Sequence, residues 1–144
     1  MSETKQVLTY ADVGFGDELP ELCPDVSMAM IKRFGATTGM TYWRFTDHER
    51  ARASGLPGAI VPGIMSQGIL VGVIHSWAPN AEIRSVDTIF RAPLLVDSKP
   101  TASGVVTDID EETKVIEIDL TADEKKAFDA SVDHVRTLVD QIQL

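Results

Sequence analysis

One segment in the middle of the chain carries apolar side chains on almost every side of a helix. It covers residues 62–77 and starts with Pro62, which suits a first helical turn. A helix of about 15 residues is too short to span a bilayer, and this one has no polar face to show to water. We therefore expect a central helix that the rest of the chain wraps. Gly68 and Gly72 would each weaken it by about 1 kcal/mol, so we expect another backbone to approach closely there.

Two shorter helices are expected before this segment. In the first, which begins after Ser27 and ends near Gly39, apolar residues recur at helical spacing. Thr46, followed three residues later by Glu49, matches a capping box, and Gly55 fits a left-handed helix end. The second short helix should run between that box and that glycine.

The second half of the chain alternates apolar and polar side chains, which is typical of β-strands. We expect four strands, at residues 82–91, 101–108, 115–121 and 127–136. Short connections favour an antiparallel meander, with an edge or a bulge after the first strand, where Pro93 interrupts the pattern. The last residues fit either a short docked helix or a continuation of the last strand. The expected fold is α+β, with one domain over residues 1–144.

The composition argues against several classes of protein. The 144 residues are 44% hydrophobic, which suits one compact domain. A net charge of −9, from 22 acidic and 13 basic residues, opposes binding to nucleic acid. The chain has no apolar signal segment and no apolar run of membrane-spanning length, so we expect a soluble, cytoplasmic protein. The histidines at positions 48, 75 and 134 lack metal-ligand spacing, and we expect no metal and no cofactor.

A family resemblance becomes visible upstream of the central helix. The stretch reads Gly39-Met40-Thr41-Tyr42-Trp43-Arg44-Phe45-Thr46-Asp47-His48-Glu49, followed by Ala51, Gly55 and Ile60-Val61-Pro62-Gly63. Its spacing resembles the active-site segment of MaoC-type (R)-specific enoyl-CoA hydratases, which runs Gly-Asp-x-Asn-Pro-Ile-His-x-Asp, then Ala and Gly, then Ile-x-His-Gly. The likeness is strongest over residues 51–58 and extends over most of the chain. It implies a hotdog fold, in which an antiparallel sheet wraps a long helix.

The catalytic residues of that pattern are replaced in this chain. Met40 stands where the family has its acid/base Asp, Phe45 where it has the catalytic His, and Pro62 where a second His often precedes the glycine. Met and Phe cannot exchange protons near neutral pH and can only shape a dry pocket. Gly63 still offers the helix N-terminus, with its N–H and the positive end of the helix dipole, to a thioester carbonyl. We therefore assign Met40, Phe45, Pro62 and Gly63 to substrate binding.

Asp47, His48 and Tyr42 are the remaining candidates for catalysis. Neighbouring side chains on a helix diverge by about 100°, so Asp47 and His48 are not expected to converge on one water, and Asp47 fits better as a helix cap. Tyr42 has a hydroxyl that can donate to an oxyanion, and Arg44 can pair with a phosphate or carboxylate. Packing against a second subunit is the simpler interpretation of residues 42–45, because subunit interfaces are enriched in aromatic residues and Arg.

The resemblance implies a lyase of fatty acid metabolism, a hydratase/dehydratase acting on enoyl-CoA or 3-hydroxyacyl-CoA, with coenzyme A or an acyl carrier protein delivering the substrate. It also implies a homodimer, or a heterodimer with a catalytic hotdog subunit. Because the acid/base pair is replaced, our leading hypothesis is a divergent or non-catalytic subunit working with an active homologue. Two alternatives stay open: an acyl-CoA thioesterase using Asp47 or Glu49, and a non-enzymatic module that binds an acyl ligand.

Overall fold

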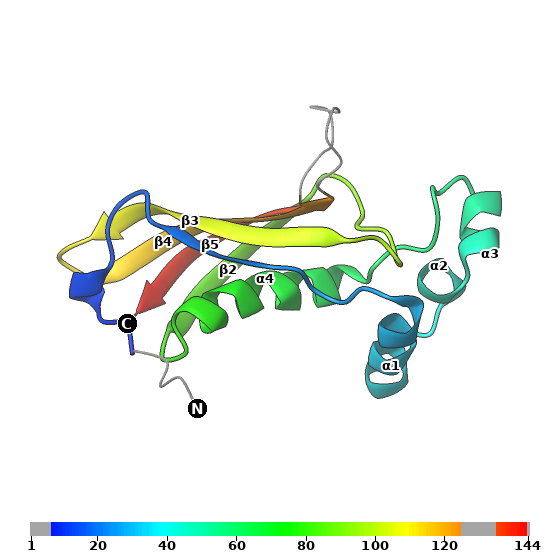
Figure 1. Cartoon of the computed structure of the whole chain (residues 1–144), viewed down its shortest axis with the longest axis horizontal. Coiled ribbons are helices and arrows are strands. Elements are labelled where there is room, and N and C mark those ends of the chain that lie inside the picture. The colour runs from blue at the N-terminus through cyan, green and yellow to red at the C-terminus, as the bar shows by residue number, and fades with distance from the viewer. Residues whose placement is uncertain (1–6, 125–134, 144) are drawn as a thin grey trace.

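A computed structural model of the chain describes residues 7–124 and 135–143. An antiparallel sheet curls over one long helix, and three shorter helices lie beyond one end of the sheet (Figure 1). In chain order, the elements are the 3-10 helix η1 (Tyr10–Asp12), β1 (Glu18–Leu22), α1 (Met28–Thr38), α2 (Trp43–Thr46), α3 (His48–Ala53), α4 (Gly63–Trp77), β2 (Glu82–Phe90), β3 (Pro100–Asp110), β4 (Val115–Glu124) and β5 (Val135–Gln143). The α+β class and the hotdog arrangement expected from the sequence are both confirmed.

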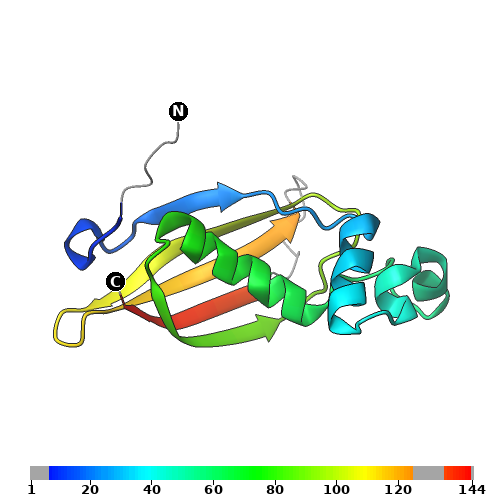
Figure 2. The same ribbon diagram turned by 90° about the horizontal axis from the view of Figure 1, so that it is seen from below.

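The central helix α4 begins one residue after its cap, Pro62, and ends at Trp77, as the apolar segment predicts. It crosses the concave face of the sheet and buries Ser66, Leu70, Val73 and Ile74 against it (Figure 2). These four positions lie on one side of the helix, at the three- and four-residue spacing of helical neighbours. Fully burying a side chain such as Leu70 stabilises a fold by about 1.5–3 kcal/mol.

The opposite side of α4 is not covered within the described chain. Ile64 is 63% exposed, and Gly68 is exposed as well. A Cβ built on Gly68 or Gly72 would meet no atom within 4 Å. The predicted close approach of another backbone is therefore wrong for this chain, because the sheet wraps only one face of the helix.

The strands follow the order β1-β3-β4-β5-β2, and every ladder is antiparallel. Strands β3, β4 and β5 form the expected meander, but β2 pairs with β5 at the sheet edge instead of lying beside β3. The connection that follows β2 is held against the segment before α4, by the N–H of Val96 donating to Ala59 O and by a bridge between Leu95 and Ile60. This connection takes the chain across the end of the sheet, so the four-strand meander is wrong at β2.

The C-terminal segment is a strand, not a docked helix. Strand β5 pairs with β4 on one side and with β2 on the other, from Val135 to Gln143. Apolar residues at helical spacing suggested a helix, but the ladders on both sides satisfy the backbone as a central strand. Residues 127–134 of the predicted last strand lie outside the described residues.

The three short helices form a lobe beside the N-terminal end of α4 (Figure 1). As predicted, Ser27 caps α1, and Gly39 ends it with φ 80°, while Gly55 follows α3 with φ 97°. The capping box at Thr46 is wrong, because Thr46 belongs to the additional helix α2 and donates its hydroxyl to Tyr42 O (3.2 Å). None of the described helices has the length and apolarity needed to cross a membrane.

Candidate functional site

The N-terminus of α4 is held between the helical lobe and the connection that follows β2. The N–H of Ile60 donates to Arg44 O (2.9 Å), and the N–H of Val61 donates to Leu94 O (2.8 Å). Pro62 is buried, and within the described chain no residue accepts a hydrogen bond from the N–H of Gly63. The first N–H groups of a helix have no intrahelical acceptor, so this one is free to bind a carbonyl oxygen.

The ring of Phe90, the last residue of β2, lies against this helix end. Its Cζ atom is 3.2 Å from the position that a Cβ on Gly63 would take, so any larger residue would require the ring to move by a few tenths of an ångström. Phe90 is 53% exposed, so its ring adds apolar surface beside Gly63. Phe90 could not be expected at this place from the sequence, because nothing local distinguishes an aromatic residue at a strand end.

Met40 and Phe45, at the positions of the family's proton-transferring pair, are both partly buried in the lobe. Phe45 packs against the hydrophobic core. The Met40 segment is fixed against α1, since a Cβ on Gly35 would lie only 2.7 Å from Met40 O. Neither side chain carries an ionisable group, so both positions contribute apolar surface.

His48 follows Phe45 by three residues, at the start of α3, and both of its ring nitrogens are engaged. Nδ1 accepts the N–H of Ala59 (3.0 Å), so it carries no proton. Nε2 therefore carries the proton and donates it to Oδ2 of Asp97 at 2.8 Å. A general base needs a free lone pair, and here the lone pair is occupied by a backbone N–H. The geometry of His48 is that of a structural link between α3 and two loops.

Asp97 completes that link and was not identified from the sequence. One of its carboxylate oxygens accepts from His48, and the other accepts the N–H of Met28 at the start of α1 (2.8 Å). These hydrogen bonds, first that from His48 and then that from Met28, lower the pKa of Asp97 below its usual value. Its backbone is left-handed, with φ 65°, a conformation that Asp adopts more readily than most residues. Asp97 thus joins α1, α3 and the connection between β2 and β3.

The other two candidates for catalysis point to different roles. Asp47 caps α3, because its Oδ1 accepts the N–H of Arg50 at 3.0 Å. Tyr42 is 54% exposed, and its ring centroid lies 5.0 Å from that of Trp43. The structure therefore does not bring Asp47, His48 and Tyr42 together around one water.

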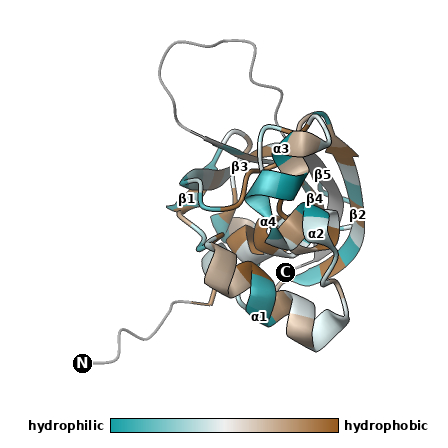
Figure 3. Cartoon of the chain, turned by 90° about the vertical axis from the view of Figure 1, so that its right-hand side faces the viewer, coloured by the Kyte–Doolittle hydropathy of each residue, from teal (hydrophilic) through white to brown (hydrophobic). Residues whose placement is uncertain are grey.

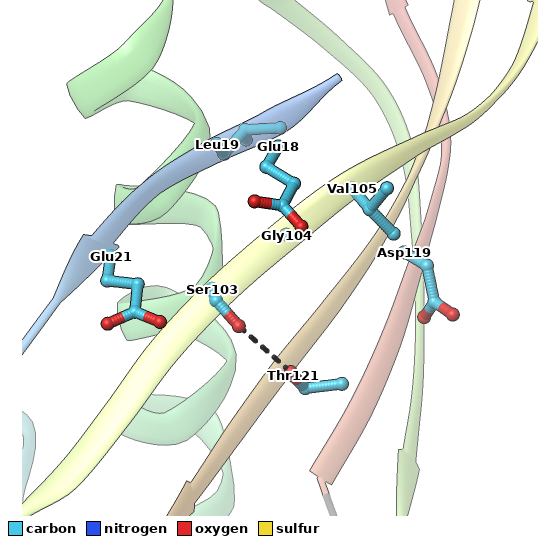
Figure 4. Close-up of a pocket in the computed structure, with 8 residues that line it drawn as sticks. All are labelled: Glu18, Leu19, Glu21, Ser103, Gly104, Val105, Asp119 and Thr121. Atoms are coloured by element: carbon cyan, nitrogen blue, oxygen red, sulfur yellow. Dashed lines mark hydrogen bonds between the residues drawn. The ribbon is translucent and has the colours of Figure 1, made fainter. Parts of the chain in front are cut away.

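A shallow hollow of about 210 Å³ lies elsewhere, between β1, β3 and β4 (Figure 4). Glu18, Glu21 and Asp119 line it, together with Ser103, whose hydroxyl is hydrogen-bonded to that of Thr121 (3.3 Å). In Figure 4 the three carboxylates do not converge on one point, and α4 lies behind the strands. In the described part of the chain, no group of three His, Cys, Asp or Glu side chains can hold a metal ion. This hollow is remote from the N-terminus of α4.

Comparison with known proteins agrees with this architecture. Among solved structures, the chain is similar to the ChsH1-ChsH2 complex from Mycobacterium tuberculosis (22% identity, TM-score 0.78, 92% of this chain and 98% of that chain). It is also similar to the (R)-hydratase from A. caviae involved in PHA biosynthesis, with 15% identity, a TM-score of 0.79 and coverage of 92% of this chain and 97% of that chain. A further similar structure is the HadBC 3R-hydroxyacyl-ACP dehydratase complex from Mycobacterium tuberculosis, with 12% identity, a TM-score of 0.63 and coverage of 89% of this chain and 95% of that chain. Among curated proteins no match was found. Residues 19–127 match the model of the MaoC like domain, and the chain therefore belongs to the MaoC-like family of hydratase and dehydratase-type hotdog proteins.

Proposed function

We propose that this chain is a divergent, non-catalytic subunit that binds acyl thioesters, such as enoyl-CoA or 3-hydroxyacyl-CoA, and works with an active homologue. One observation carries the proposal. The two proton-transferring positions of the family hold Met40 and Phe45, while both nitrogens of His48, the imidazole that follows them in the chain, are engaged by Ala59 and Asp97. Hydration of an enoyl thioester needs a group that takes a proton from water, and these residues do not supply one.

The N-terminus of α4, where we expect the thioester carbonyl to bind, supports a binding role. The N–H of Gly63 is free, lies at the positive end of α4, and is flanked by the apolar ring of Phe90. An apolar surface with one oriented polar donor is the usual composition of a small-molecule site.

Two uncovered surfaces support the partnership. Among the described strands, β2 pairs only with β5 and has no partner at its other edge, and Ile89 on this strand is 51% exposed. The uncovered side of α4, with Ile64 exposed, lies next to this edge (Figure 2). An open strand edge beside exposed apolar residues is a surface that soluble proteins normally cover. A second hotdog subunit joining at β2 would extend the sheet and cover α4, in line with the two-protein complexes among the similar structures.

The test is hydration of crotonyl-CoA and longer enoyl-CoAs by the purified chain, alone and mixed with an active hotdog hydratase. We expect no turnover by the chain alone and a change in rate or chain-length preference in the mixture. Turnover by the lone chain that disappears in His48→Asn or Asp47→Asn, with the fold intact by circular dichroism, would overturn the proposal.

A second function, binding of an acyl group without a catalytic partner, is favoured by the apolar character of Met40 and Phe45. Calorimetry with acyl-CoA and the matching free acid distinguishes the two. The binding module holds its ligand equally well alone, whereas the subunit gains affinity in the mixed complex. A thioesterase would instead release free thiol, and Asp47, one of the two acids it would require, is engaged as a helix cap.

A further inference from the structure

The helical lobe differs in charge from the rest of the chain. We define the lobe as residues 28–58. Five of the 13 basic residues lie in it, but only two of the 22 acidic ones, Asp47 and Glu49. The lobe is therefore positively charged, although the whole chain has a net charge of −9. A positive region on an acidic protein attracts anions locally and repels them elsewhere.

Two arginines of the lobe share one aromatic ring. The guanidinium carbon of Arg44, on α2, lies 5.5 Å from the ring centroid of Trp43, and that of Arg50, on α3, lies 5.1 Å from it. The ring is partly buried, so it holds two exposed cationic side chains on one patch. Neither guanidinium has a carboxylate within ion-pair distance among the described residues. Their hydrogen-bond donors are available to a ligand.

A third arginine of the same region, Arg52, is hydrogen-bonded to a loop. The Nε of Arg52 donates to Pro57 O (3.3 Å), which ties α3 to the loop that follows it. Among the described residues, the cationic side chains over the Trp43 ring are those of Arg44 and Arg50. The ring of Tyr42 contacts that of Trp43 at an interplanar angle of 42° and is exposed beside the two arginines. The patch is small and cationic, which suits a small anion better than a broad protein interface.

This patch lies at the end of α4 where the free N–H is found (Figure 1). The carbonyl oxygen of Arg44 accepts the N–H of Ile60, three residues before Gly63. The next residue, Phe45, turns inward to the core, while the side chain of Arg44 stays at the surface. Figure 3 views this end directly and shows hydrophilic residues on α3. The two helices that carry the arginines, α2 and α3, thus lie at the end of α4 that begins with Gly63 (Figure 1).

We propose that Arg44 and Arg50, held on the ring of Trp43, bind the phosphate groups of coenzyme A. The inference rests on the proposed function and deepens it, by naming the carrier of the acyl group. Coenzyme A bears a diphosphate and a 3′-phosphate at the end remote from the thioester, and guanidinium groups bind phosphate oxygens in pairs. A carrier protein presents its acyl chain on a single phosphodiester, which carries one negative charge and offers the two guanidiniums fewer phosphate oxygens than coenzyme A does.

The experiment is calorimetry on the purified full-length chain with coenzyme A, dephospho-coenzyme A and pantetheine, the fragment without phosphate. The variant is Arg44→Gln with Arg50→Gln. The matched control is Lys114→Gln, which removes a cation from above another ring, since Lys114 Nζ lies 4.5 Å from the centroid of Tyr10 at the far end of the sheet. For each guanidinium removed we expect roughly tenfold weaker binding of coenzyme A. Pantetheine binding should be unchanged in the variant, and Lys114→Gln should bind all three ligands like the wild type.

Three results would overturn the inference: no binding of coenzyme A, equal affinity of the wild type for coenzyme A and pantetheine, or equal affinity of wild type and double variant for coenzyme A. A double variant that keeps its affinity but alters assembly in sedimentation would assign the patch to a protein partner instead. Failure of the proposed function is distinguishable. Butyryl-pantetheine tests the acyl site without phosphate, and 3′,5′-adenosine diphosphate tests the arginines without an acyl group.

Discussion

Replacing Gly68 by Ala tests whether a partner covers the open side of α4. A Cβ at this position meets no atom of the described chain within 4 Å, so the methyl group adds no clash. Alanine favours the helix by about 1 kcal/mol over glycine in an exposed helix interior. For a chain of this length, that gain corresponds to a rise in Tm of about 4 °C. The isolated monomer should therefore be stabilised, as measured by thermal unfolding followed by circular dichroism.

The same methyl group should weaken assembly. If a second subunit packs on this face at glycine, an added Cβ overpacks the contact by about 1–3 kcal/mol, which is roughly tenfold or more in Kd by sedimentation equilibrium. Gly35→Ala is the control, because α1 offers the same helix gain while the Cβ would lie 2.7 Å from Met40 O. That variant should be destabilised as a monomer. The reasoning fails if Gly68→Ala lowers the Tm of the monomer, or if it assembles with its partner as tightly as the wild type.

Four further outcomes are expected, at three positions. Asp97→Ala should lose about 1–3 kcal/mol of stability in urea unfolding, because the N–H of Met28 and the Nε2–H of His48 both lose their acceptor. The pKa of Asp97 is lowered in the folded state, so its carboxylate stabilises the fold fully above the unfolded pKa of about 3.9. This contribution is lost as pH falls through the folded-state pKa. Asp97→Asn should therefore make the free energy of unfolding depend less on pH in that acidic range. His48→Asn should lower stability by about 1–2 kcal/mol without changing acyl-CoA affinity in calorimetry, whereas equal stability combined with lost binding would place His48 in the site. Leu70→Ala, at a fully buried position of α4, should cost about 2–5 kcal/mol, and a loss below 1 kcal/mol would contradict the packing of this helix.

Local chemistry determined which parts of this fold could be predicted. The apolar segment predicted α4, because a short helix without a polar face needs a cover. Ser27, Gly39 and Gly55 predicted helix ends, because capping and left-handed backbone depend on the residue itself. Alternation of apolar and polar residues predicted the strands but not which strands pair. The pairing of β2 with β5 depends on the connection after β2, whose contacts join residues far apart in sequence.

The candidate site divides along the same line. Spacing predicted a site role for positions 40, 45 and 63, and the cap role of Asp47, which the structure shows, followed from its residue type. Asp97 could not be identified, because it lies 49 residues from His48 and acts only once the lobe meets the connection after β2. Phe90 is similar: its packing on Gly63 is set by the sheet edge, and no pattern in its own segment indicates it.

The lobe carries Met40 and Phe45, whereas the sheet and α4 supply most of the buried core. Met40 contributes no strand pairing, and Phe45 adds its ring to the hydrophobic packing where the family has an imidazole. An apolar side chain at these two positions therefore leaves the strand pairing and the core packing in place. For this architecture, melting temperature and reactivity are independent properties, and a well-behaved, cooperatively unfolding protein of this shape is no sign that a reaction takes place in it.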